Sequence, residues 1–169
     1  MSWRELAAAA LALPLVACGF HPLYAERSPL GYNPVFASIE VRPAADRLGQ
    51  IMTDAVRQTL NPRGVDIEKR YVLRLSATEV RSDLGIRRDN TSARGELLIN
   101  ANLSLAPRGT ATPLYSDSVR STTAYNISND AYAATVAEEN ARDEAAAQLG
   151  REIALRVQLF LRRQAEAKP

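Results

Sequence analysis

The stretch Leu97-Leu98-Ile99-Asn100-Ala101-Asn102-Leu103-Ser104-Leu105 decides the fold. Its odd-numbered positions are all apolar, whereas most of its even-numbered positions are polar. Because successive side chains of a β-strand point to opposite faces of a sheet, this alternation predicts a strand buried on one face only. The stretch 71–80 alternates in the same way, and a weaker strand is expected at 114–125, after a hairpin-sized turn at Pro107-Arg108-Gly109.

Helices are predicted before and after these strands in the sequence. Asp46 is a favourable N-cap, and the apolar positions that follow it recur at helical spacing as far as Leu60. The sequence Asn61-Pro62-Arg63-Gly64 then ends that helix, because proline cannot continue it and glycine accepts a positive φ. From Ser128 onward the alanine-rich chain predicts a long helix with an apolar face made of Tyr132, Ala137, Ala141, Ala145, Leu149, Ile153, Val157 and Phe160.

The predicted order is strand (37–42), helix, three strands and a long helix. Short connections between the three later strands favour antiparallel pairing, and two amphipathic helices bury their apolar faces most economically on one face of the sheet. We therefore expect an α+β fold, a two-layer sandwich of two helices packed on a four-stranded, mostly antiparallel sheet. It would form a single domain over residues 37–163, followed by a short C-terminal tail over residues 164–169.

The composition is that of an ordinary globular protein. The chain has 169 residues, of which 46% are hydrophobic and 24% charged, and this excludes a coiled-coil rod or a disordered tail. The net charge is only +2. Because no large field of one sign is present to drive binding to a polyanion, we expect no nucleic-acid partner.

The first residues are typical of an export signal. Arg4 precedes an uncharged run from Leu6 to Val16, which is too short to remain as a membrane-spanning helix. The sequence Leu15-Val16-Ala17-Cys18-Gly19 then resembles the bacterial lipobox, which implies cleavage after residue 17 and acylation of Cys18, including an amide-linked chain such as palmitate. Residues 1–17 would thus be a lipoprotein signal peptide, and residues 18–36, with three prolines, a lipidated tether. In the enterobacterial sorting rule, Asp after the acylated cysteine retains a lipoprotein in the inner membrane. By resemblance to that rule, Gly19 indicates the outer membrane.

The residues offer little catalytic chemistry, and we expect that the protein is not an enzyme. His21 is the only histidine and Cys18 the only cysteine, so no His-dependent triad or His/Cys metal site can be assembled, and neither a metal nor a cofactor is expected beyond the lipid on Cys18. The acidic residues Glu138, Glu139, Asp143 and Glu144 are better interpreted as a solvated helical face than as an acid pair.

A family resemblance is carried by motifs in order along the chain. Cys18-Gly19-Phe20-His21-Pro22-Leu23-Tyr24 is the sharpest of them, and the strand Ile39-Glu40-Val41, the turn Arg63-Gly64-Val65, the strand 71–75 and the segment 132–147 follow. Together they resemble the LptE family of lipopolysaccharide-assembly lipoproteins from the Gram-negative outer membrane. The family's fold, two helices on a four-stranded sheet, agrees with the sandwich expected from the residues.

The resemblance implies a function and partners. A family member plugs the lumen of the large β-barrel LptD and assists its assembly, and the pair delivers lipopolysaccharide to the outer leaflet. The protein would then be lipid-anchored in the cell outer membrane, on its periplasmic side and in the barrel lumen. The polar strand faces with Asn100, Asn102 and Ser118 suit hydrogen bonding in a wet lumen, although plain exposure to solvent explains them equally. The alternative function is a periplasm-facing lipoprotein that binds a soluble ligand or cell-wall component without a barrel partner.

The polar segment between the strands at 71–80 and 97–105 is the candidate lipopolysaccharide-binding site. Arg81, Arg87, Arg88 and Arg94 outnumber Asp83 and Asp89 there, and guanidinium groups can hold phosphates with charge-assisted hydrogen bonds. Arg88 is the nearest match to a lipid-contact arginine of the family. A solvated loop of mixed charge is the competing interpretation for each of these residues.

Overall fold

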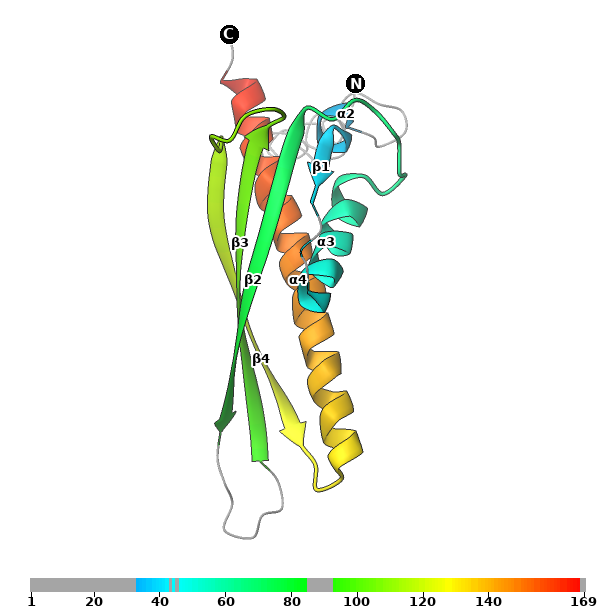
Figure 1. Cartoon of the computed structure of the whole chain (residues 1–169), viewed down its shortest axis with the longest axis vertical. Coiled ribbons are helices and arrows are strands. Elements are labelled where there is room, and N and C mark those ends of the chain that lie inside the picture. The colour runs from blue at the N-terminus through cyan, green and yellow to red at the C-terminus, as the bar shows by residue number, and fades with distance from the viewer. Residues whose placement is uncertain (1–32, 43, 45, 85–92, 168–169) are drawn as a thin grey trace, which may run out of the picture. The chain divides into compact units, whose positions relative to one another are not determined.

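The computed structural model describes residues 33–42, 44, 46–84 and 93–167. The chain divides into two units, residues 1–33 and 34–169, and every element below belongs to the second unit. In chain order the elements are α2 (Pro34–Ala37), β1 (Ile39–Val41), α3 (Arg47–Leu60), β2 (Tyr71–Leu84), β3 (Ala93–Pro107), β4 (Tyr115–Ile127) and α4 (Ala131–Glu166). Within this unit the four strands form one layer and α3 and α4 form the other (Figure 1). The predicted α+β sandwich is confirmed, with α2 as an additional short helix.

The strands lie in the order in which they occur in the chain. Strands β2, β3 and β4 are joined by hairpin connections and pair antiparallel, whereas β1 pairs parallel to β2. A parallel neighbour requires a crossover connection, and α3 supplies it between β1 and β2. The sheet is therefore mixed, with one parallel pair at the β1 edge.

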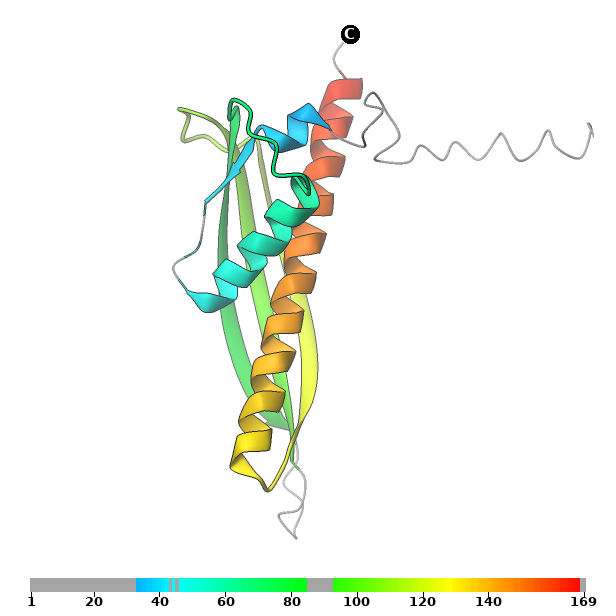
Figure 2. The same ribbon diagram turned by 90° about the vertical axis from the view of Figure 1, so that its right-hand side faces the viewer.

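The alternation of the central strands sets which face is buried. In β3, Leu97, Ile99 and Leu105 are fully buried, and their neighbours in the register lie on the same face of β2 and β4. Helices α3 and α4 cover this inner face (Figure 2). The even-numbered residues of the three long strands form the outer face, on which no helix of the described residues lies.

The two helices contact each other closely at a glycine. An added Cβ at Gly150 of α4 would stand 2.5 Å from the backbone oxygen of Met52 and 2.7 Å from the Cβ of Ala55, both on α3. Helix α3 begins where the sequence predicted, because the Asp46 carboxylate accepts a hydrogen bond from the Gly49 amide at 3.0 Å. A buried cluster of aliphatic side chains from both helices and the sheet forms the core around this contact.

Some boundaries differ from the sequence-based prediction. Strand β2 continues to Leu84, so the first four residues of the polar segment expected at 81–92 belong to that strand, and β3 already starts at Ala93, before the expected Leu97. Helix α2 spans the predicted boundary between tether and domain at residues 36 and 37, and Ser38 closes it by donating from its amide and hydroxyl to Pro34 and Val35. Tyr132, expected on the apolar face of the long helix, is 80% exposed.

Candidate functional site

The four arginines of the predicted lipopolysaccharide site do not share one loop. Arg81 lies in β2 and Arg94 in β3, and the strands are paired up to Leu84 and Arg94. Arg87 and Arg88 lie in the connection between those strands, outside the described residues. The structure therefore places Arg81 near the end of β2 and Arg94 near the start of β3. We call this end of the sandwich, where β2 ends and β3 begins, the tip.

Arg81 and Arg94 face opposite sides of the sheet. Arg81 is on the inner face, where its Nη1 lies 2.8 Å from Glu138 Oε2 and its guanidinium lies 6.0 Å from the centroid of the Tyr125 ring. Arg94 occupies an even-numbered position of β3 on the outer face and is exposed. Arg81 thus takes part in a contact between sheet and helix, whereas Arg94 points away from the helices.

The contact of Arg81 belongs to a charged cluster between α4 and the sheet, made of Glu79, Arg81, Tyr125, Glu138 and Arg142. Arg142 donates two hydrogen bonds to the Glu79 carboxylate, at 2.8 and 3.0 Å, and a third to Glu138 Oε1 at 2.7 Å. The Tyr125 hydroxyl donates to Glu138 Oε2 at 3.0 Å. Side chains of the cluster's carboxylates and of Arg142 are only about a quarter exposed or less, so the hydrogen bonds operate at reduced solvent screening.

The electrostatics of this cluster follow from its geometry. Hydrogen bonding to Glu79 raises the pKa of Arg142 further, against the opposing effect of burial. Burial acts to raise the pKa of Glu138, but the hydrogen bonds from Tyr125 and Arg142 and the charge of Arg81 outweigh it and lower that pKa. Both groups therefore stay ionised at neutral pH, and the cluster is held by matched charges.

This cluster also revises the interpretation of the acidic residues of α4. Glu138 points to the sheet, with 17% of its side chain exposed, and is not on a solvated face. Asp143 pairs with Arg47 of α3 at 2.8 Å and is one-third exposed. Glu139 and Glu144 are exposed as predicted. No local pattern signals the inward orientation of Glu138, because its partner Arg81 lies 57 residues away on another element.

A second polar cluster joins α4 to β4. Arg156 donates to Asp117 Oδ2 at 2.7 Å and to Glu152, and the Tyr115 hydroxyl donates to the same Asp117 oxygen at 2.8 Å. The Tyr115 ring stacks on Phe160 with centroids 4.6 Å apart. Hydrogen bonds from Arg156 and Tyr115 lower the pKa of Asp117. All of these groups are satisfied by one another, which is the arrangement of a structural contact.

The outer face of the sheet is left uncovered by the helices of the described domain. Its rows across β2, β3 and β4 are dominated by hydroxyl and amide side chains, namely Ser76, Thr78, Asn100, Asn102, Ser104, Ser116, Ser118 and Thr122. Arg74, Arg94 and Arg120 add positive charge and Glu96 a negative one, and Arg120 Nε donates to Asn100 Oδ1 at 2.8 Å. Exposed Val80, beside Leu98, makes a small apolar area on this face near the tip. Such a surface can form many hydrogen bonds to a polar partner.

The described part of the chain holds neither a metal-binding cluster nor a membrane-spanning helix. Among its residues, no group of three or more His, Cys, Asp or Glu side chains is arranged to hold a metal ion. Within the same residues, no helix combines the length and the hydrophobicity needed to cross a bilayer. Cys18, the predicted lipidation site, lies outside the described residues.

Comparisons with solved structures show what this fold is similar to. A putative lipoprotein from Caulobacter crescentus aligns with a TM-score of 0.61 at 22% identity, over 76% of this chain and 93% of the other. A minor lipoprotein from Acinetobacter baumannii aligns at 0.59 and 14%, over 75% and 95%. The rare lipoprotein B from Shewanella oneidensis aligns at 0.56 and 18%, over 76% and 98%. At these identities the likeness shows the fold alone.

Sequence comparison identifies the family. No curated protein matches the chain. The family profile described as LptE, lipopolysaccharide-assembly, matches residues 36–157, which is most of the chain and includes every strand and both long helices in part or whole. The expected resemblance is therefore confirmed, and this chain belongs to the LptE family of lipopolysaccharide-assembly proteins.

Proposed function

We propose that this lipopolysaccharide-assembly protein acts as an outer-membrane lipoprotein that occupies the lumen of an LptD-type β-barrel and assists assembly of that barrel. The observation that carries the proposal is the outer face of the sheet. It is broad, uncovered by α3 and α4, and rich in hydroxyl and amide groups. The lumen of a large barrel is polar and wet, so a plug needs such a surface.

Anchoring belongs to the same proposal. Acylation of Cys18 would supply the membrane attachment, because two or more acyl chains anchor a protein stably without a spanning helix. The covalent lipid is the only non-protein group that the proposal requires. The lipidation is checked by mass spectrometry of the protein from membranes, in which a Cys18→Ser variant should lose the acyl mass and the membrane attachment.

The partnership is tested by affinity purification of the acylated, tagged protein from detergent-extracted outer membranes. A near-stoichiometric LptD-type barrel should accompany it. A variant with Asn102→Trp and Ser118→Trp, which lie side by side in the register on the outer face, should lose most of the barrel. Arg63→Trp, in the turn after α3, is the matched control and should retain it. If the unsubstituted protein is recovered alone from membranes that contain the barrel, the plug function is wrong and a ligand-binding lipoprotein takes its place.

Direct contact with lipopolysaccharide is the second part of the proposal, with Arg94 on the outer face and Arg87, Arg88 and Arg81 nearby in sequence as the candidate residues. Arg81 is the weakest of them, because its guanidinium pairs with Glu138. A double substitution of Arg87 and Arg88 to Glu should weaken lipopolysaccharide binding and leave barrel association intact. Unchanged lipopolysaccharide binding would remove these two residues from the site.

A further inference from the structure

A cleft opens at the end of the domain opposite the tip. It has a volume of about 320 Å³ and lies between β1, the C-terminal part of α3 and the connection from α3 to β2. Helix α2, this connection, the β3–β4 turn and the last turn of α4 all gather at the same end in both views (Figures 1 and 2). We call it the base. The volume is at the lower end of the range for small-ligand sites.

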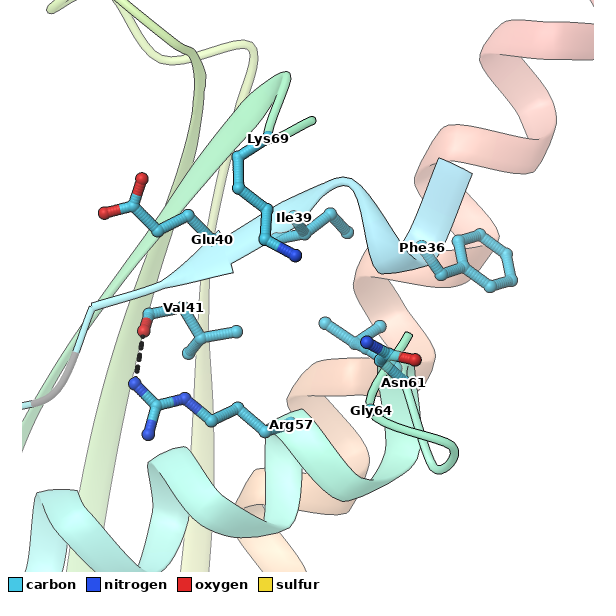
Figure 3. Close-up of a pocket in the computed structure, with 9 residues that line it drawn as sticks. Phe36, Ile39, Glu40, Val41, Arg57, Asn61, Gly64 and Lys69 are labelled. Carbon is cyan, nitrogen blue, oxygen red and sulfur yellow. Dashed lines mark hydrogen bonds between the residues drawn. The ribbon is translucent and has the colours of Figure 1, made fainter. Parts of the chain in front are cut away.

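Two cationic side chains, Lys69 and Arg57, line this cleft together with an apolar wall. Phe36, Ile39, Val41 and Leu60 form the wall. Lys69 Nζ donates to the Ala37 carbonyl at 3.1 Å, and Arg57 Nη2 donates to the Val41 carbonyl at 2.9 Å. Figure 3 shows these side chains reaching β1 from opposite sides. Lys69 is thus held by the last residue of α2 and Arg57 by the last residue of β1, and the remaining N–H groups of each cation are available to an anion.

The acidic groups nearby leave this positive charge largely uncompensated. The partners of Arg57 and Lys69 are Asp54 at 3.5 Å and Asp66 at 3.6 Å, and those carboxylates are 65% and 98% exposed, so the pairs are screened by water. Glu40 also lines the cleft, but its own partners are Arg42 at 3.7 Å and Arg108 at 3.8 Å. An anion with a short apolar portion complements the cleft.

The surroundings of the cleft indicate where such an anion comes from. Val35 on α2 and Leu114 before β4 are each 42% exposed at the base, and the connection that borders the cleft carries the exposed Arg63 and Arg70 beside the exposed Asp66 and Glu68. Exposed apolar side chains interspersed with arginines are suited to the interface between lipid headgroups and acyl chains. The described domain also begins at this end, with Pro34.

From these observations we infer that the cleft between β1 and α3 binds the headgroup of an anionic phospholipid, with Lys69 and Arg57 as the cations that attract its negative charge and the apolar wall against the glycerol and first methylenes. The base then lies at the headgroup region of the membrane. The inference extends the membrane placement proposed above. It does not depend on a barrel partner, so this inference and the proposed barrel function can be refuted separately.

The test uses the acylated protein in detergent, titrated with dihexanoyl-phosphatidylglycerol and followed by the amide NMR signals of residues 37–41 and 57–69. Saturable shifts confined to these segments are expected. Lys69→Gln and Arg57→Gln should each weaken binding by about fivefold or more, the effect of one basic side chain beside an anionic lipid. Arg151→Gln, which removes an exposed cation from α4, is the matched control and should bind as the unsubstituted protein does.

Conservative variants and alternative ligands complete the test, the variants as controls for misfolding and the ligands to identify the anion. Lys69→Arg and Arg57→Lys keep the cation and should keep most of the binding, so a loss in the glutamine variants alone is an effect of charge. Equal binding of dihexanoyl-phosphatidylcholine, or equal affinity for glycerol 3-phosphate without acyl chains, overturns the assignment to an anionic phospholipid. Shifts that do not saturate, or that are unchanged in both glutamine variants, overturn the site.

Discussion

Substitution of Gly150 by alanine should destabilise the protein, although the same change in an exposed helix stabilises it. Alanine is favoured over glycine in a helix interior by about 1 kcal/mol. At position 150, however, the new Cβ would stand 2.5 Å from the Met52 oxygen and 2.7 Å from the Ala55 Cβ. Real Cβ atoms do not approach backbone that closely, so α3 and α4 must separate where their packing closes the core.

The magnitude follows from the balance of these two effects. Overpacking of a close-packed contact costs about 2–3 kcal/mol, and the helix propensity of alanine offsets about 1 kcal/mol of it. The net loss of about 1–2 kcal/mol lowers the Tm by about 3–6 °C for a domain of this size. The assay is thermal and urea unfolding of the acylated protein in detergent, with the free energy of unfolding taken from the urea transition.

Two controls isolate the cause. Arg151→Gly and Arg151→Ala, at an exposed interior position of the same helix, should differ by about 1 kcal/mol through propensity alone. In a double-mutant cycle with Ala55→Gly, which removes the Cβ contact but leaves the contact with the Met52 oxygen, the double variant should lose less stability than the sum of the two single losses. A Gly150→Ala variant as stable as the unsubstituted protein, or more stable, would refute the close approach of the two helices.

Three further predictions test other contacts. Thr53→Val should raise the free energy of unfolding by about 1 kcal/mol in the same urea assay, because the Thr53 hydroxyl is fully buried in α3 and has no hydrogen-bond partner among the described residues. Gly95→Ala should lower the Tm and perturb the near-UV signal of tyrosine, because the new Cβ would stand 2.4 Å from the Tyr125 ring. In a Tyr125→Leu background, which removes that ring, Gly95→Ala should lower the Tm by less. Glu138 has a lowered pKa in the folded state, so its stabilisation is present above the ordinary carboxyl value of 4.5 and is lost as the pH falls through the lowered value. The Tm difference between the unsubstituted protein and Glu138→Gln should therefore be largest near neutral pH and shrink in acid; a difference independent of pH would contradict the charged cluster.

The parts of the fold that follow from local pattern could be predicted from the sequence. The alternation in β3 identified Leu97, Ile99 and Leu105 as buried, and Asp46 identified the start of α3, because burial and capping depend on residues close together in the chain. The parallel pairing of β1 with β2 is compatible with the predicted sheet, but local pattern does not specify it. It depends on a crossover helix, and an alternation of apolar and polar residues does not reveal which strand lies beside which.

Features that depend on distant partners could not be predicted. The polar residues from Arg81 onward look like a loop, because charged side chains take the odd-numbered positions that are apolar earlier in the strand. In the structure β2 continues because Arg81 and Glu79 point inward to carboxylate and guanidinium partners on α4. The same interaction removes Glu138 from solvent. A charge at an inward position is acceptable only if its partner is present, and that partner lies more than fifty residues away.

The cluster around Arg142 also explains how one sheet can be covered by two helices of different length, α3 and α4. Helix α3 packs beside α4 over the half of the sheet near the base, and the aliphatic core lies there, including Met52, Leu73 and Ile153. Towards the tip α4 continues alone, and there the contacts between helix and sheet are ion pairs and hydrogen bonds around Arg142, with small alanine side chains on the helix. An apolar core covered by one helix would leave aliphatic surface in water, whereas matched charges tolerate partial hydration. A charged contact is therefore suited to the narrower end of the sandwich, and it leaves the tip soluble in the polar surroundings that the proposed function requires.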